Sequence, residues 1–192
     1  MTDTVEVGEQ TDATPLELLP FPRRGPRRRD LDAEVGTFLL EESAAFDERR
    51  YTDWLDLIDE RFHYQVPVPL LREDPSLPRH SERALLFEAT KNVLAMRLGR
   101  VGQPHAWCDR PSAVVRHFVG GVRVFDADEV GTLRVDCNVL VTWSRGRDEN
   151  TLATAARHDI LTRSGPHELR LLRRRVLLDT EVATHEQLSI IY

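Results

Sequence analysis

Residues 46–68, FDERRYTDWLDLIDERFHYQVPV, bring six carboxylates and one histidine together, which are residue types used in general acid–base catalysis. Their spacing favours a structural role. Asp53, Asp56 and Asp59 recur at every third residue, which places them on one exposed side of a short helix whose inward side carries Trp54. We therefore interpret most of these carboxylates as helix-surface and capping groups.

Metal binding is the second chemistry that the residue types could support. The two cysteines, Cys108 and Cys137, stand apart, and no two of the seven histidines have the H-x-x-x-H spacing of a zinc site. A Rieske cluster requires two cysteines and two histidines in paired short motifs. The sequence therefore predicts no metal and no cofactor in this chain.

The formal net charge of −6 argues against a nucleic-acid partner, which normally requires a basic face. No apolar run approaches the ~20 residues of a membrane span, and residues 1–20 lack the basic and apolar regions of a secretory signal. We expect a cytoplasmic protein that binds neither nucleic acid nor membrane.

The 192 residues are enough for one domain, which we place at residues 30–192. Residues 1–29 are expected to form an extended N-terminal arm, because residues 19–30 (LPFPRRGPRRRD) contain three prolines and five arginines. Such an arm could be a solvated tail or a strap that lies on another subunit.

The elements that would position the candidate residues follow from hydrophobic periodicity. In LRVDCNVLVTW, residues 133–143, apolar side chains alternate with mostly polar ones, which predicts a long strand with one buried face. The full set of expected elements is a helix over 31–46, a short helix from Thr52, a strand over 62–66, a helix from Ser81 to about Gly99, and a β-meander over 113–125, 133–143, 151–162 and 168–179. Helices followed by a curled meander predict an α+β fold in which the sheet wraps around the helices.

This order resembles the cone-shaped fold shared by nuclear transport factor 2 and ketosteroid isomerase. Three strings resemble the β (small) subunit of aromatic-ring-hydroxylating dioxygenases: FLLEESAAFDERRYTDWLDLIDERFHYQVPV, HAWCDRPSAVVRHFVGGVRV, and LRLLRRRVLLD followed by EQLSIIY. The similarity covers about residues 30–192. The chain departs from the family pattern at Ala113, where an arginine is usual, and at Gly120-Gly121.

The resemblance implies a noncatalytic subunit of an oxidoreductase complex for aromatic hydrocarbon catabolism. In that family the α (large) subunit carries a Rieske [2Fe-2S] cluster and a mononuclear iron. Electrons come from NADH through a reductase, and the product is a cis-dihydrodiol. Three α subunits assemble with three β subunits, so self-association of this chain as a trimer is expected.

An alternative hypothesis is a free-standing isomerase or dehydratase of the same fold, and a further one is a plain binding module. Such an enzyme needs an acid or base with a raised pKa inside the cone. The best candidates are His158, whose small neighbours would let it point inward, and Asp136, which lies opposite the apolar series on a face predicted to be wet. His63 and Tyr64 are weaker candidates.

The residues predicted at a partner interface are different ones. Tryptophan and arginine are enriched at interface anchors, and the sequence offers Trp107, Arg116 and His117 at the start of the meander. Arg173, Arg174 and Arg175 cannot all face solvent from a strand, so at least one of them must point toward the core or toward a partner, and we place Arg174 at the partner interface. The apolar end of the sequence, with Ile190 and Tyr192, is expected to dock on its own sheet or on a neighbour. The complete interface prediction is Trp107, Arg116, His117, Arg174, Ile190 and Tyr192.

Overall fold

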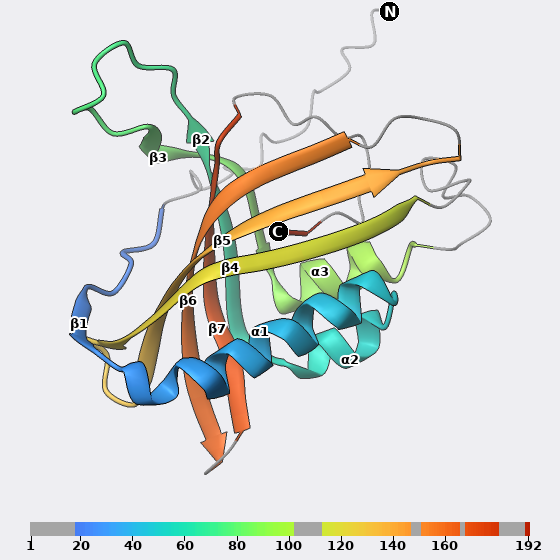
Figure 1. Ribbon diagram of the computed structural model, residues 1–192, viewed down its shortest axis with the longest axis horizontal. Coiled ribbons are helices and arrows are strands. Elements are labelled where there is room, and N and C mark those ends of the chain that lie inside the picture. The colour runs from blue at the N-terminus through green and yellow to red at the C-terminus, as the bar shows by residue number, and fades with distance from the viewer. Residues whose placement is uncertain (1–17, 102–112, 147–150, 166–167, 181–190) are drawn as a thin grey trace, which may run out of the picture.

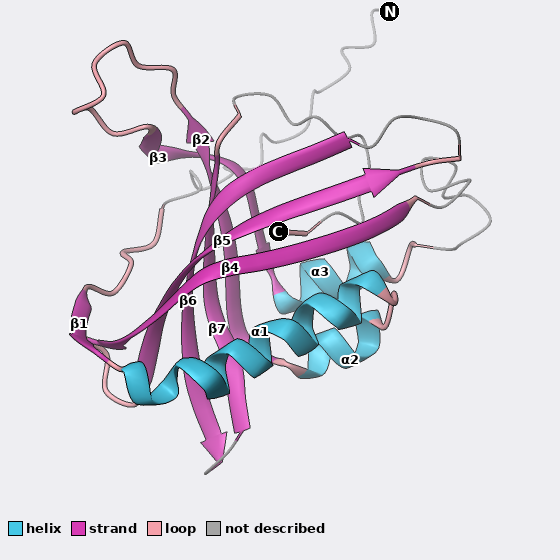
Figure 2. Cartoon of the chain, viewed as in Figure 1, coloured by secondary structure: helices cyan, strands magenta, loops and turns pink. Residues whose placement is uncertain are grey.

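The computed structural model describes residues 18–101, 113–146, 151–165, 168–180 and 191–192. These residues form one curled seven-stranded sheet, in the order β1-β4-β5-β6-β7-β2-β3, with three α-helices against it (Figures 1 and 2). All neighbouring strands are antiparallel except β2 and β7, which run parallel.

The helices are α1 (Asp32–Asp47), α2 (Tyr51–Asp56) and α3 (Lys91–Leu98), and a 3₁₀ turn covers Arg29–Leu31. The strands are β1 (Arg24–Arg27), β2 (Ile58–Pro69), β3 (His80–Thr90), β4 (Val114–Ala127), β5 (Thr132–Ser144), β6 (Thr151–Gly165) and β7 (Glu168–Leu178).

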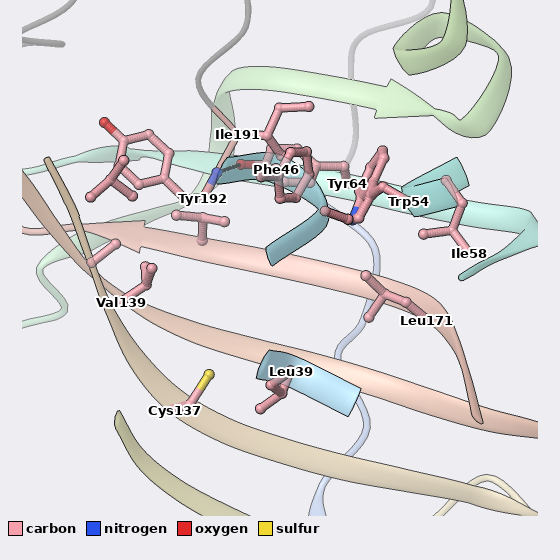
Figure 3. Close-up of a cluster of buried hydrophobic side chains, with 14 of the residues drawn as sticks. Leu39, Phe46, Trp54, Ile58, Tyr64, Cys137, Val139, Leu171, Ile191 and Tyr192 are labelled. Carbon is pink, nitrogen blue, oxygen red and sulfur yellow. Dashed lines mark hydrogen bonds between the residues drawn. The ribbon is translucent and has the colours of Figure 1, made fainter. Parts of the chain in front are cut away.

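The hydrophobic core lies between α1 and the inner face of the sheet. Val135, Cys137 and Val139 of β5 are buried there, as their alternation predicts, and α1 contributes Leu39 and Phe46 (Figure 3). Helix α1 packs against β4, and the strands curve around it (Figure 1). The expected α+β architecture, with a sheet wrapped around helices, is confirmed.

The helix expected from Ser81 to Gly99 is wrong in its first half. Residues 80–90 form β3, which pairs with β2 along its length, and the helix begins only at Lys91. Met96 of this helix is 63% exposed, so it does not belong to the buried side of α3. Pairing with β2 outweighs helix propensity here, since propensity differences among ordinary residues are below ~1 kcal/mol each.

The segment assigned to an N-terminal arm is tied to the sheet in its described part. Residues Arg24–Arg27 form β1 and pair with the end of β4. Arg28 binds Asp126 and Arg27 binds Asp32, so these two arginines meet carboxylates of their own chain.

Candidate functional site

The interior of the cone holds four charged side chains, which we call the interior ion cluster: Glu42, Arg157, Asp159 and Arg174. Arg174 of β7 contacts Glu42 Oε1 at 2.8 Å and Asp159 Oδ1 at 2.8 Å. Arg157 of β6 lies 3.1 Å from Glu42 Oε2 and 3.1 Å from Asp159 Oδ2. All four are buried, and two positive charges face two negative ones.

Strand alternation explains why these residues meet. Arg157 and Asp159 are two residues apart on β6, so their side chains share the inner face. Asp159 lies directly opposite Arg174 in the β6–β7 register. Glu42 reaches the same point from α1, where it is one of the buried residues of the helix.

The charges of the cluster determine its chemistry. Burial by itself would raise the pKa of Glu42, but Arg174 and Arg157 outweigh burial and lower that pKa to about 2. The indole Nε1 of Trp54 also donates to Glu42 Oε1 at 3.0 Å. A general acid or base that works near neutrality needs a carboxyl pKa shifted upward. Glu42 has the opposite shift, so it is a structural anion.

The last two residues fill the space beside the cluster. The Tyr192 amide donates to the Tyr64 hydroxyl at 3.2 Å, and Arg174 Nη1 donates to the Tyr192 main-chain oxygen at 3.3 Å. In Figure 3, Ile191 lies beside Phe46, and Tyr192 lies at the edge of the same buried cluster, on the side of Val139. Burial raises the pKa of Tyr64 to about 12, so its phenol stays neutral.

His117 holds the same end of the chain. Its Nε2 lies 3.0 Å from the Ile191 main-chain oxygen, and its Nδ1 lies 2.8 Å from Asp47 Oδ1 at the end of α1. Only 5% of its side chain is exposed. His117 therefore links β4, α1 and the end of the chain, and both ring nitrogens are engaged within the subunit.

These contacts change the interpretation of the predicted interface residues. Arg174 has no exposed side-chain surface in the single chain, so the structure places it toward the core, and its assignment to the partner interface is wrong: α1 and β6 supply its carboxylates. Tyr192 docks on its own chain. Arg116 is exposed on β4, and Trp107 and Ile190 lie outside the described residues.

The two pocket candidates, Asp136 and His158, lie together on the outer face of the sheet, opposite each other in the β5–β6 register. His158 Nε2 is 3.8 Å from Asp136 Oδ1. The expectation that His158 points inward is therefore wrong, because its neighbours Arg157 and Asp159 take the inward positions. Burial lowers the pKa of His158; Asp136 opposes that shift and Arg134 adds to it.

The expectation that Asp136 is wet is also wrong, since only 1% of it is exposed. Residues 19–24, which we call the strap, cover it. Arg24 Nε contacts Asp136 Oδ2 at 2.6 Å, and Arg134 Nε contacts Oδ1 at 3.0 Å. Phe21 of the strap lies against the guanidinium groups of Arg134 and Arg175, 5.2 and 4.8 Å from its ring centroid. Asp136 is thus an ion-paired anchor for the strap.

His63 and Tyr64 are adjacent on β2, and their side chains lie on opposite faces. Tyr64 is in the core, where it contacts Phe62 and Phe87. His63 lies opposite Arg173 in the β2–β7 register. They do not form a catalytic pair.

The rest of the outer face, over β4, β5 and β6, leaves several apolar side chains exposed beside the exposed Arg116. Val114 and Phe118 are each 56% exposed and Leu152 is 58% exposed. A groove of about 680 Å³ runs beside them. Its lining residues are Phe118, Val119, Gly120, Gly121, Asn138, Val139, Leu140, Thr154, Ala155, Ala156 and Asp179.

Two negative findings concern only the part of the chain that the structure describes. It contains no group of three or more histidine, cysteine or acidic side chains placed to hold a metal ion. None of its helices is long and apolar enough to cross a membrane.

The curled sheet around one long helix, with an ion-paired interior, defines a cone-shaped α+β protein of the nuclear transport factor 2 type. A family model described as ring hydroxylating beta subunit matches residues 41–185. The chain belongs to this family.

Solved structures with the same fold include naphthalene 1,2-dioxygenase with indole bound, at a TM-score of 0.73 and 22% identity over 85% of this chain and 86% of that one. For the β subunit of benzoate 1,2-dioxygenase from Burkholderia mallei, the TM-score is 0.61 and the sequence identity is 18%. The match covers 77% of this chain and 89% of that one. For an NTF2-like protein with a cystatin-like fold from Novosphingobium aromaticivorans, the TM-score is 0.53 and the sequence identity is 17%. The match covers 83% of this chain and 88% of that one.

The sequence interpretation missed the interior ion cluster. Two signals were present: Glu42 is a charged residue on the apolar face of the first helix, and Arg157 and Asp159 share a face of a strand that also carries buried alanines. A charged residue at a core position requires a charged partner, and three such positions indicate a network.

Proposed function

We propose that this chain is the noncatalytic β subunit of an aromatic-ring-hydroxylating dioxygenase and supports the assembly of its α subunit. The observation that carries the proposal is the interior ion cluster. An isomerase or dehydratase of this fold would need an acid or base with a raised pKa inside the cone. The carboxylates inside this cone are instead held by two arginines, and the pKa of Glu42 is lowered. The family match points to the same function.

In this proposal the iron chemistry belongs to the α subunit. That subunit would carry the Rieske [2Fe-2S] cluster and the mononuclear iron, with electrons supplied from NADH by a reductase. The complex would contain three α and three β subunits in the cytoplasm. Arg116, which is exposed on β4, and Trp107 and Ile190 are proposed at subunit contacts.

The test is to produce the chain alone and together with its cognate α subunit. We expect the isolated chain to contain no stoichiometric iron and to show no Rieske absorption. Together the two subunits should form one species whose mass, measured by light scattering, equals three copies of each, with iron and oxygenase activity. Stoichiometric iron in the isolated chain, or an α subunit that is fully assembled and active without this chain, would contradict the proposal.

A further inference from the structure

The strap lies over a row of polar side chains on the outer face of the sheet. In the strand registers, Asp136 is opposite His158, His158 is opposite Arg175, and Arg175 is opposite Gln65. The ring centroid of Phe21, in the strap, lies 6.0 Å from that of His158. A change in the charge of His158 therefore acts directly beside the strap.

The sheet holds the strap through side chains. The Leu19 amide donates to Gln65 Oε1, and Arg175 donates to the Leu19 main-chain oxygen. Arg134 Nη1 donates to the Pro22 main-chain oxygen at 2.7 Å. Within the described residues, no hydrogen bond between main chains joins the strap to the sheet ahead of β1. A segment held by so few groups opens at a lower free energy than a core strand does, so the strap can open while the sheet stays folded.

Arg134 connects His158 to the strap. Its Nη2 lies 3.5 Å from His158 Nδ1. The same guanidinium donates to the Pro22 main-chain oxygen and lies 5.2 Å from the ring centroid of Phe21. A guanidinium has N–H donors and no acceptor, so the lone pair of His158 must be on Nδ1 and its single proton on Nε2. The closed strap therefore fits a neutral His158.

A second proton on His158 finds no acceptor while the strap is closed. It would place an N–H group of the ring against Arg134. Asp136 does not compensate, because its Oδ1 is contacted by Arg134 Nε at 3.0 Å and its Oδ2 by Arg24 Nε at 2.6 Å. His158 Nε2 lies 3.8 Å from Asp136 Oδ1, which is beyond hydrogen-bond distance.

The charges around His158 also disfavour a further positive charge. Within the described residues, β5, β7 and the strap bring one carboxylate and three arginines to its face of the sheet: Asp136, Arg134, Arg175 and Arg24. Burial lowers the pKa of His158, and Arg134 and Arg24 add to that shift, while Asp136 and the inner-face Asp159 oppose it. The same crowding affects Arg175, whose pKa is lowered to about 10 by burial and by Arg134.

We propose that the strap is a pH-dependent cover, which is closed over the sheet while His158 is neutral and opens when His158 takes up a second proton. The imidazolium repels Arg134, which holds Pro22 and Phe21, and Arg175, which holds Leu19. The closed strap binds the second proton less readily than the open strap does. Closure is therefore favoured above the ordinary histidine pKa of 6.5 and is weakened as the pH falls below it.

The test measures hydrogen exchange of the strap by mass spectrometry in the full chain, between about pH 5 and about pH 8, a range that spans histidine titration. His158→Gln keeps a polar side chain that does not titrate. His63→Gln is the matched control, because His63 lies on the same outer face, opposite Arg173 in the β2–β7 register. Two chains compared at one pH share the intrinsic pH dependence of exchange, and a peptide from β5 reports any global unfolding.

We expect the ratio of the strap exchange rate in the wild type to that in His158→Gln to rise at least about 3-fold from about pH 8 to about pH 5. The ratio to His63→Gln should stay constant, and the β5 peptide should stay protected. A constant ratio to His158→Gln, an equal rise with His63→Gln, or exchange of the β5 peptide together with the strap would overturn the inference.

A second measurement decides the case in which glutamine itself loosens the strap. The ring protons of His158 in the wild-type chain are titrated by NMR, and the midpoint is compared with that of strap opening. We expect the two midpoints to coincide. Strap opening at a different pH from the titration of His158 would overturn the inference, whatever the variant shows.

Discussion

Replacing Arg174 by methionine tests whether the interior ion cluster holds the cone together. The guanidinium contacts Asp159 at 2.8 and 2.9 Å and Glu42 at 2.8 Å. Arg174→Met leaves both carboxylates buried with Arg157 as their remaining cation. Breaking a buried ion pair by removing one partner costs about 3–5 kcal/mol.

For a chain of this size, about 3–5 kcal/mol corresponds to a fall of roughly 6–20 °C in the melting temperature. The assay is urea unfolding followed by tryptophan fluorescence, which reports on the cluster because Trp54 donates to Glu42. Arg173→Met is the matched control, since Arg173 is on the same strand but pairs with Glu129 at the surface. Such surface pairs contribute ~0–1 kcal/mol.

A second variant separates charge from packing. In Arg174→Met combined with Asp159→Asn, one arginine again faces one carboxylate, and we expect recovery of at least about 1 kcal/mol relative to the single variant. Should Arg174→Met unfold at the same urea concentration as Arg173→Met, or gain nothing from the second change, the argument that the cluster is a stabilising core element is refuted.

Three further predictions concern other groups. The pKa of Glu42 is lowered to about 2 in the folded chain, so its contribution to stability is present above the ordinary carboxyl pKa and is lost as the pH falls from about 4.5 towards 2. The free energy of unfolding of Glu42→Gln should therefore fall less steeply over this pH range than that of the wild type. His158→Ala and Asp136→Asn should leave the turnover of the assembled dioxygenase within a few-fold of wild type. Asp136→Asn should also lower the stability of the chain by loosening the strap. A loss of ~10²–10⁴ in kcat would instead identify an acid–base group. Tyr192→Ala should lower the free energy of unfolding by about 3 kcal/mol, as for other large buried aromatic side chains, and an unchanged urea midpoint would show that the end of the chain does not stabilise the cone.

Much of the fold was predictable because its signals are local. The alternation in residues 133–143 predicts β5 and its buried face, and three strings identify the family to which the chain belongs. The periodicity of α1 predicts its inward side, where Val35, Phe38 and Leu39 are buried. Residues 80–90 were misread as helix because their strand partner, β2, lies across a ten-residue loop whose closure no local pattern reveals.

The sequence by itself determined that Arg174 faces away from Arg173 and Arg175, since side chains alternate along a strand. It left open what Arg174 would meet. Tertiary structure decided that, because its carboxylate partners come from 15 residues earlier, at Asp159, and from 132 residues earlier, at Glu42. Likewise the sequence placed Asp136 on the outer face, but only the path of the strap buried it there. The face of the sheet that a side chain occupies depends only on its position along the strand. Burial and ion pairing depend instead on which distant segments of the chain the curled sheet brings together.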